Sequence, residues 1–258
     1  MMLGVALGAP IGGVLGSVDP LRPLFAGSAL LVVASVLATA VLPDPGGLER
    51  RPGTRAIWQM VRQNRDVIAP LIFAFADRFT VGFYTTTFSL FASGLHGATP
   101  PQVGLWISAF MLPFALFSFP FGVLADRFSK TGLLVGGSLI YGVLTASLGF
   151  WPTEFIGVGM AVIGISAAVM FVPSLLMTTD LTPPAIRGAA LGAFNTAGSL
   201  GFILGPITGG LVSQTVGASF GAVNGYRAAF AVAGSAEILC ALLALPFLMR
   251  LRAAGRTS

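Results

Sequence analysis

Long apolar blocks place the strongest constraint on how this chain can fold. A helix that crosses the roughly 30 Å of hydrocarbon in a bilayer needs about 20 predominantly apolar residues. Eight apolar blocks alternate with charged or glycine- and proline-rich segments, and the first block is shorter than a full span. The blocks cover residues 1–16, 23–42, 67–95, 103–124, 131–151, 155–179, 189–216 and 228–249. The pattern predicts an all-α, polytopic membrane protein surrounded by a lipid bilayer.

The small number of charged residues excludes a water-soluble fold. The chain is 55% hydrophobic and 9% charged, whereas soluble domains carry about 25% charged residues. Its net charge of +5 would suggest a nucleic-acid partner in a soluble protein. Here the basic residues lie between apolar blocks, so we expect no nucleic-acid partner. A single cysteine, Cys240, excludes an intramolecular disulfide and a cysteine-based metal site, and we expect no metal or cofactor.

The basic residues are distributed unequally between the two sets of alternating loops. Two of them, Arg22 and Arg227, lie in one set. Eleven lie in the other set: Arg50, Arg51, Arg55, Arg62, Arg65, Arg127, Lys130, Arg187, Arg250, Arg252 and Arg256. Cytoplasmic loops carry the excess of Lys and Arg. We therefore predict a multi-pass protein of the cell (inner) membrane with both chain ends in the cytoplasm.

A proline-, glycine- and arginine-rich stretch divides the chain. Residues 44–66 contain Pro-Gly-Gly and several arginines, which is typical of a connecting segment. We predict a cytoplasmic linker at 44–66, between a short amino-terminal part (1–43) and a six-helix bundle (67–252). Residues 253–258 would form a cytoplasmic tail.

Two apolar blocks share a pattern of glycine at every fourth position with a proline inside. The copies read Gly4-x-x-x-Gly8-x-x-x-Gly12-Gly13 with Pro10, and Gly201-x-x-x-Gly205-x-x-x-Gly209-Gly210 with Pro206. The block after each copy opens alike, as Arg22-x-x-Phe25 and Arg227-x-x-Phe230. The spacing of the copies fits six helices with their loops, which predicts a parallel six-helix repeat. Glycine at this spacing makes a flat face for close helix packing, and such a face could also hold a transporter closed on one side.

Three segments resemble one transporter family. The loop Gly122-Val-Leu-Ala-Asp126-Arg127-Phe-Ser-Lys130 resembles the signature loop of the major facilitator superfamily. The stretch from Gly201 to Gly210 resembles the glycine–proline motif of its drug/proton antiporter branch, and the stretch from Asp180 to Gly188 resembles the preceding cytoplasmic loop. The resemblance implies an incomplete fold of that superfamily, equivalent to helices five to twelve, with a complete carboxyl-terminal six-helix half.

The repeat also predicts an amino-terminal truncation. Arg187 opens its block fourteen residues before Gly201, and the same distance before Gly4 falls upstream of Met1. We expect the first helix to lack its cytoplasmic half and the family's first four helices to be absent from this sequence.

The signature loop has two interpretations. Asp126, Arg127 and Lys130 could simply form a charged turn that ends two helices. The resemblance implies more, namely a charge latch in which the carboxylate faces a helix amino-terminus of the other half, favoured by the helix dipole. The relevant end of that partner helix would be missing here.

Asp77 and Arg78 lie about 15 Å into the third block, near the bilayer midplane. An intramembrane charge costs about 2.5–3.5 kcal/mol and normally faces a cavity or a partner. Mutual neutralisation near the helix entry is the alternative, but adjacent helical residues diverge by about 100°, so we do not expect a direct pair. Asp77 shares a helix face with Tyr84. We predict that Asp77 carries a proton and that Arg78 modulates it or contacts an anion.

Glu237 lies midway through the last block. The resemblance implies a peripheral helix, which favours a structural hydrogen bond to a neighbouring helix. A role in the cavity or in proton binding is the alternative.

The resemblance implies a secondary transporter that exports small organic molecules in exchange for protons, by rocking of two six-helix halves. Its partners would be a small-molecule substrate, protons and an amino-terminal half that this sequence lacks. The alternative is a non-transporting remnant, or a half-module that needs a partner chain. Neither a Ser/His pair nor a His-Glu-x-x-His run occurs within the blocks, so we do not expect an enzyme.

Overall fold

A computed structural model describes residues 2–41 and 54–254 of the chain. The described part is helical and contains no strand. Its α-helices are α1 (Met2–Val18), α2 (Arg22–Val41), α3 (Thr54–Gln63), α4 (Ile68–Thr85), α5 (Thr87–His96), α6 (Pro100–Ala125), α7 (Lys130–Ser147), α8 (Thr153–Asp180), α9 (Arg187–Phe220) and α10 (Ala222–Ala253). Short 3-10 turns join them at Arg65–Val67, Leu148–Phe150 and Pro184–Ile186. Residues 44–53 of the predicted linker and 255–258 of the predicted tail lie outside the described residues.

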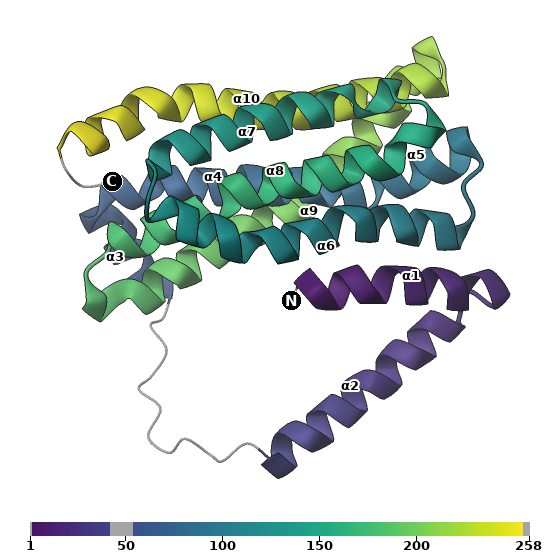
Figure 1. Ribbon diagram of the computed structural model, residues 1–258, viewed down its shortest axis with the longest axis horizontal. Helices are drawn as coiled ribbons and strands as arrows, with labels where there is room; N and C mark the ends of the chain where they lie inside the picture. Colours follow the sequence, from purple (N-terminus) through teal and green to yellow (C-terminus); the bar gives the residue numbers. More distant parts are fainter. Residues whose placement is uncertain (1, 42–53, 255–258) are drawn as a thin grey trace.

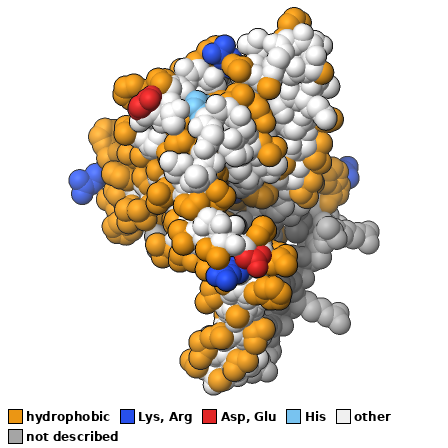
Figure 2. Space-filling view, turned by 90° about the vertical axis from the view of Figure 1, so that its right-hand side faces the viewer, with side chains coloured by type: hydrophobic (Ala, Val, Ile, Leu, Met, Phe, Trp, Pro, Cys, Tyr) orange, Lys and Arg blue, Asp and Glu red, His pale blue; other side chains and the backbone are white. Residues whose placement is uncertain are grey.

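The predicted spans are confirmed. Within the described residues, seven helical stretches are long and apolar enough to cross a membrane, and the first helix is apolar but shorter. Each stretch coincides with a block read from the sequence, and the largest differences are extensions, as in α9. The protein is therefore a multi-pass α-helical membrane protein. Figure 2 shows that charged side chains are sparse on the face it displays, as expected for a chain with so few of them.

The third predicted span is not one continuous helix. It breaks at Thr86, whose backbone angles (φ −120°, ψ −63°) end α4 and start α5. No proline or glycine marks this position, because the local sequence is Thr85-Thr86-Thr87. β-branched threonines crowd the preceding turn of a helix and hydrogen-bond their own backbone. Thr85 does so here, since its hydroxyl donates to the Gly82 carbonyl at 2.9 Å.

Part of the predicted linker is a helix. Residues 54–63 form α3, and Met60 of this helix is buried against Ala189, Ala190 and Ala193 at the start of α9. Trp58 on the same helix is largely exposed. The linker prediction therefore omitted an element, because a short amphipathic helix within a proline- and arginine-rich connection gives no long apolar block.

Helices α4 to α10 lie side by side in one bundle, with α1 along α6 and α2 leaving the bundle at an angle (Figure 1). The connections α6–α7 and α8–α9, helix α3 and the end of α10 gather at one end of the bundle. These are the segments that the charge distribution predicts to be cytoplasmic. Their shared end fits that topology, whose absolute orientation stays a prediction.

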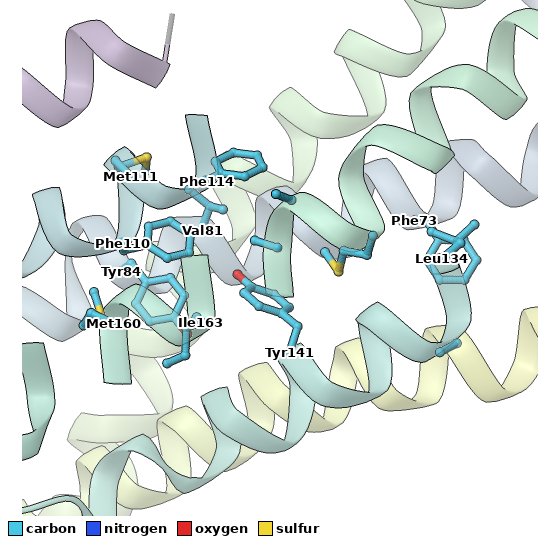
Figure 3. Close-up of a cluster of buried hydrophobic side chains, with 14 of the residues drawn as sticks. Phe73, Val81, Tyr84, Phe110, Met111, Phe114, Leu134, Tyr141, Met160 and Ile163 are labelled. Atoms are coloured by element: carbon cyan, nitrogen blue, oxygen red, sulfur yellow. The ribbon is translucent and has the colours of Figure 1, made fainter. Parts of the chain in front are cut away.

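The core of the bundle is built from aromatic and aliphatic side chains (Figure 3). Fully buried members come from several helices, for example Phe73 and Tyr84 of α4, Phe110 of α6, Tyr141 of α7 and Ile163 of α8. Tyr84 and Phe110 pack with ring centroids 5.1 Å apart. Two tyrosines in this core bring hydroxyl groups into an otherwise apolar interior, next to the charges described below.

Candidate functional site

The glycine-rich face of α9 packs directly on α4. A Cβ atom at Gly201 would collide with the Phe75 carbonyl, and one at Gly205 would collide with the Phe79 carbonyl. At Gly209 a Cβ would collide with the Thr87 hydroxyl. Helix packing, the simpler interpretation of the pattern, is therefore what the structure shows at these three positions.

The other two members of the motif behave differently. The ring of Pro206 lies against Gly82 of α4, where an added Cβ would come within 2.6 Å of the proline Cδ. Gly210 has nothing within 4 Å of a Cβ position. The further idea that this interface holds one side of a transporter closed stays a prediction.

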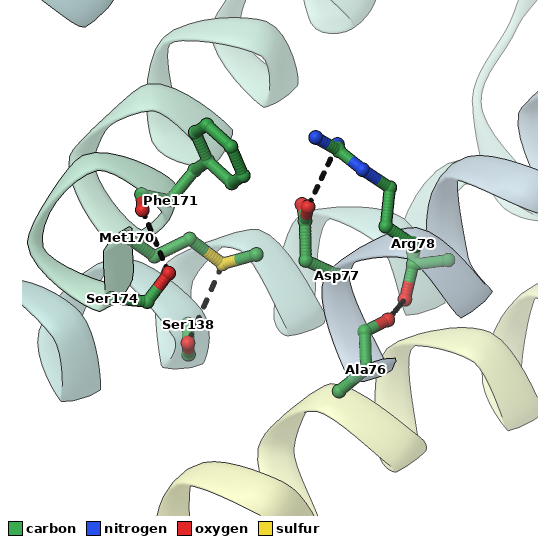
Figure 4. Close-up of polar contacts among 8 residues, drawn as sticks. Ala76, Asp77, Arg78, Ser138, Met170, Phe171 and Ser174 are labelled. Carbon is green, nitrogen blue, oxygen red and sulfur yellow. Dashed lines mark hydrogen bonds and ion pairs between the residues drawn. The ribbon is translucent and has the colours of Figure 1, made fainter. Parts of the chain in front are cut away.

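Asp77 and Arg78 form a direct ion pair on α4. Arg78 Nη1 lies 2.9 Å from Asp77 Oδ2 (Figure 4). The expectation that the adjacent residues would not pair was wrong, because the long arginine side chain folds back across the angle between the two Cβ directions. The pair lies ten residues into the helix, and therefore deep within the predicted span. Its two charges neutralise each other at that depth. The other oxygen, Asp77 Oδ1, has no hydrogen-bond partner among the described residues.

The two members of the pair differ in exposure. The side chain of Asp77 is 3% exposed and that of Arg78 is 21% exposed. The Arg78 guanidinium lies 4.7 Å from the ring centroid of Phe171 on α8, as a cation–π contact. Gly198 of α9 leaves room for it, since a Cβ there would come within 2.9 Å of Arg78 Cγ. The Arg78 side chain thus occupies the space between α4, α8 and α9, and the Asp77 side chain is buried more completely than that of Arg78.

Tyr84 lies inside the bundle rather than on an open face. Its hydroxyl is 2.7 Å from Thr145 Oγ1 of α7, and the residue is 1% exposed. Tyr141, also on α7, is fully buried, and its hydroxyl has no hydrogen-bond partner among the described residues. Sequence analysis missed Thr145 and Tyr141, because isolated hydroxyl residues within apolar blocks carry no spacing signal.

Glu237 of α10 belongs to the same buried region. It is 0% exposed, and neither carboxyl oxygen has a hydrogen-bond partner among the described residues. The Ser138 hydroxyl of α7 lies close enough to Glu237 to act on its carboxyl as a hydrogen-bonding group, and in the geometry described it donates to Met170 Sδ at 3.4 Å (Figure 4). Ser138 is thus the group of a neighbouring helix that faces Glu237, while the Glu237 oxygens have no well-formed hydrogen bond among the described residues. Asp77 and Glu237 interact electrostatically, so the two carboxyls form one cluster.

The signature loop is held to the neighbouring loop by an ion pair. Lys130 Nζ lies 2.9 Å from Asp180 Oδ2, which joins the α6–α7 and α8–α9 connections. Arg187 Nε donates to the Thr179 carbonyl at 3.2 Å and ties the second connection to the end of α8. The two segments that resemble family motifs thus meet in space.

The remaining members of the signature loop are placed as follows. Asp126 follows the end of α6, and both Asp126 and Arg127 are exposed. Gly122 faces α8, with Val172 Cγ1 3.6 Å from a Cβ position. The charge latch stays a prediction. As for metal sites, no three His, Cys, Asp or Glu side chains gather at a binding distance within residues 2–41 and 54–254.

Fold and site together define a multi-pass helical membrane protein with a charge cluster buried among its spans. Comparison with known families gives the class a name. The family model of the Major Facilitator Superfamily matches residues 71–258. The chain belongs to this superfamily, whose members are transporters.

Individual relatives are similar to part of the chain. An uncharacterized MFS-type transporter of Methanocaldococcus jannaschii is 30% identical over 162 residues, 61% of this chain and 41% of the relative. The probable sulfoacetate transporter SauU of Cupriavidus necator is 35% identical over 148 residues, 57% of this chain and 33% of the relative. The multi-drug resistance efflux pump PmrA of Streptococcus pneumoniae is 28% identical over 147 residues, 56% of this chain and 34% of the relative. The matched region thus spans less than half the length of each of these relatives.

Proposed function

We propose that this protein moves small organic molecules across the cell (inner) membrane by alternating access, coupled to protons. The observation that carries the proposal is the Asp77–Arg78 pair, 2.9 Å apart and deep within a predicted span. Charged residues within membrane spans are costly and mark substrate or proton pathways. In a bundle with a purely structural role, apolar residues of similar volume would stabilise the fold as well as this ion pair does.

The pair offers a means of coupling. While Asp77 is ionised, it neutralises Arg78. A proton on Asp77 would remove that attraction and leave the guanidinium held by its contact with Phe171, so that it could move within the space between α4, α8 and α9. Asp77 is thus the proposed proton carrier, and Arg78 is its modulator or an anion contact.

Alternating access requires a second half that faces the bundle. In the superfamily the two halves rock about a site near the bilayer midplane. Helices α4 to α10 supply one half, and α1 contacts it along α6. A complementary amino-terminal half is the proposed partner, and both chain ends are proposed to lie in the cytoplasm.

Export in exchange for protons is the proposed direction. The glycine–proline motif of α9 supports it, as does the similarity to an efflux pump of Streptococcus pneumoniae. Sulfoacetate, which appears in the name of another relative, is an anion and provides a probe for the opposite direction, import.

The test uses reconstituted protein in liposomes with an imposed pH gradient. Ethidium and sulfoacetate serve as a cationic and an anionic probe. We expect proton-driven transport of one of them, and we expect Asp77→Asn to abolish the proton-driven component while probe exchange without a gradient persists. Glu154→Gln, at an exposed position in the first turn of α8, is the matched control and should behave like the wild type. Full proton-driven transport by Asp77→Asn would refute the role of Asp77.

A further inference from the structure

Glu237 is the least compensated acidic group in the described bundle. It is completely buried at the centre of α10, and both of its oxygens lack hydrogen-bond partners among the described residues. Close packing shields it, because α7 and α10 meet where Gly142 and Gly234 face each other. An added Cβ at Gly142 would come within 2.6 Å of Ile238 Cγ1, the side chain next to Glu237. Little space is left there for water to solvate a charge.

The surrounding charges do not neutralise Glu237. Arg78 is the cation that lies at mid-depth in the described spans, and it is engaged by Asp77 at 2.9 Å. The titratable and charged groups of the helices packed against α10 are Asp77, Arg78 and Tyr84 of α4, Lys130 and Tyr141 of α7, His96 of α5 and Arg187 of α9. Lys130, Arg187 and His96 stand at the ends of their helices, so none of them reaches the middle of α10.

An ionised Glu237 would therefore be a second negative charge beside an already neutral pair. A buried charge without a partner or a hydrogen bond costs several kcal/mol. A protonated Glu237 leaves the cluster of Asp77, Arg78 and Glu237 with no net charge. The two carboxyls therefore differ in the protonation state that their surroundings favour: Asp77 has a cation beside it, which favours the ionised form, whereas Glu237 has none, which favours the protonated form.

We propose that Glu237 is a second proton-binding site, electrostatically linked to Asp77. The proposal rests on the proton-coupled transport proposed above and adds a site to it. In the conformation described, Glu237 holds a proton while Asp77 is ionised against Arg78. When Arg78 moves away from Asp77 during the transport cycle, Asp77 loses its neutralising cation and binds a proton, and the charge state of each carboxyl then affects proton binding by the other.

A groove brings the outside of the bundle close to this site. It has a volume of about 410 Å³ between α4 and α10, and its lining consists of apolar side chains, Cys240, and Arg65 of the turn that precedes α4. Cys240 follows Glu237 by three residues, so both lie on one face of α10. Cys240 also interacts electrostatically with Glu237. A small change in the separation of α4 and α10 would open a path for a proton from this groove.

Infrared spectroscopy tests the site without any substrate. At neutral pH, exposed carboxyl groups are ionised, so a protonated carboxyl within the bundle is visible by its carbonyl stretch. We expect this band in the wild type and in Asp77→Asn, and its loss in Glu237→Gln. Glu237→Asp, which keeps the carboxyl, should shift the band and covers the case in which the glutamine variant does not fold. A band that persists in Glu237→Gln overturns the proposal.

Transport measurements then separate this site from the proposed function. With the probe that the wild type moves, we expect Glu237→Gln to reduce proton-driven accumulation about tenfold or more while exchange without a gradient is retained. Wild-type coupling in Glu237→Gln overturns the proposal even if the infrared band is lost. Loss of coupling in Asp77→Asn with normal coupling in Glu237→Gln leaves the proposed function standing and removes only the second site. Coupling that survives in both variants counts against both proposals.

Discussion

Helices α1 and α9 carry the same glycine pattern but use it differently. In α9, the glycines at 201 and 205 press against α4, and Gly209 presses against the end of α4 and the start of α5. In α1, the corresponding Gly4, Gly8 and Gly12 have nothing within 4 Å of a Cβ position. Helix α1 contacts α6 through another face, where a Cβ at Gly13 would collide with the Pro100 carbonyl. The pattern thus makes a face on which close packing can occur, and the neighbours available decide whether it is occupied.

The contact between α1 and α6 shows that α1 is nevertheless held in place. The Ser108 hydroxyl donates to the Ala6 carbonyl, and a Cβ at Gly104 would collide with the Ala9 carbonyl. Among the described residues, helix α2 makes no comparable contact with the bundle, and none of its residues is buried. The amino-terminal part therefore consists of one docked helix and one that shows its apolar surface on all sides.

The largest expected effect comes from filling the glycine face that is occupied. Gly205→Ala would force its Cβ into the Phe79 carbonyl and should destabilise the bundle by about 3 kcal/mol, the upper part of the range for overpacking. Gly8→Ala is the matched change in α1 and should alter stability by no more than about 0.5 kcal/mol. Unfolding of both variants in mixed detergent micelles measures the difference. Equal losses of stability in the two variants would mean that the glycine faces of α1 and α9 are packed equally closely.

An intermediate effect is expected at the contact between α1 and α6. Gly104→Ala should loosen α1 at a cost of about 1–2 kcal/mol, because α1 can shift more easily than a helix within the bundle. Protease sensitivity of α1, and a disulfide cross-link between cysteines introduced at positions 6 and 108, would report the loosening. Gly27→Ala in α2, where nothing lies within 4 Å, is the control. Unchanged cross-linking in Gly104→Ala would contradict close packing at this contact.

The smallest effect on stability is expected where α9 leaves room for Arg78. Gly198→Ala would meet Arg78 Cγ at 2.9 Å, and a flexible side chain can move aside. We expect about 1 kcal/mol or less in stability but a clear loss of proton-driven transport, because Arg78 would be displaced from Asp77. Gly210→Ala, in open space on the same helix, should change neither property. Normal proton-driven transport by Gly198→Ala would mean that proton coupling does not depend on the position of Arg78.

Part of this molecule could be predicted from residue patterns. The spans follow from apolar length, since a bilayer requires about 20 apolar residues per helix. The packing role of Gly201 and Gly205 follows from their spacing, since residues four apart share a helix face. The depth of Asp77 and Arg78 follows from their place within a span. The break at Thr86 and the helix α3 had no comparable signal.

The sequence by itself determined the number and approximate length of the apolar spans, the glycine-lined faces and the presence of charges within the spans. These properties depend on residues near one another in the chain and on the thickness of the membrane. Only the tertiary structure decided that Arg78 turns back to Asp77, that Glu237 has no hydrogen-bond partner among the described residues, and that one glycine face is filled while the other is open. Each of these depends on which side chains arrive from other helices, and local periodicity carries no information about them.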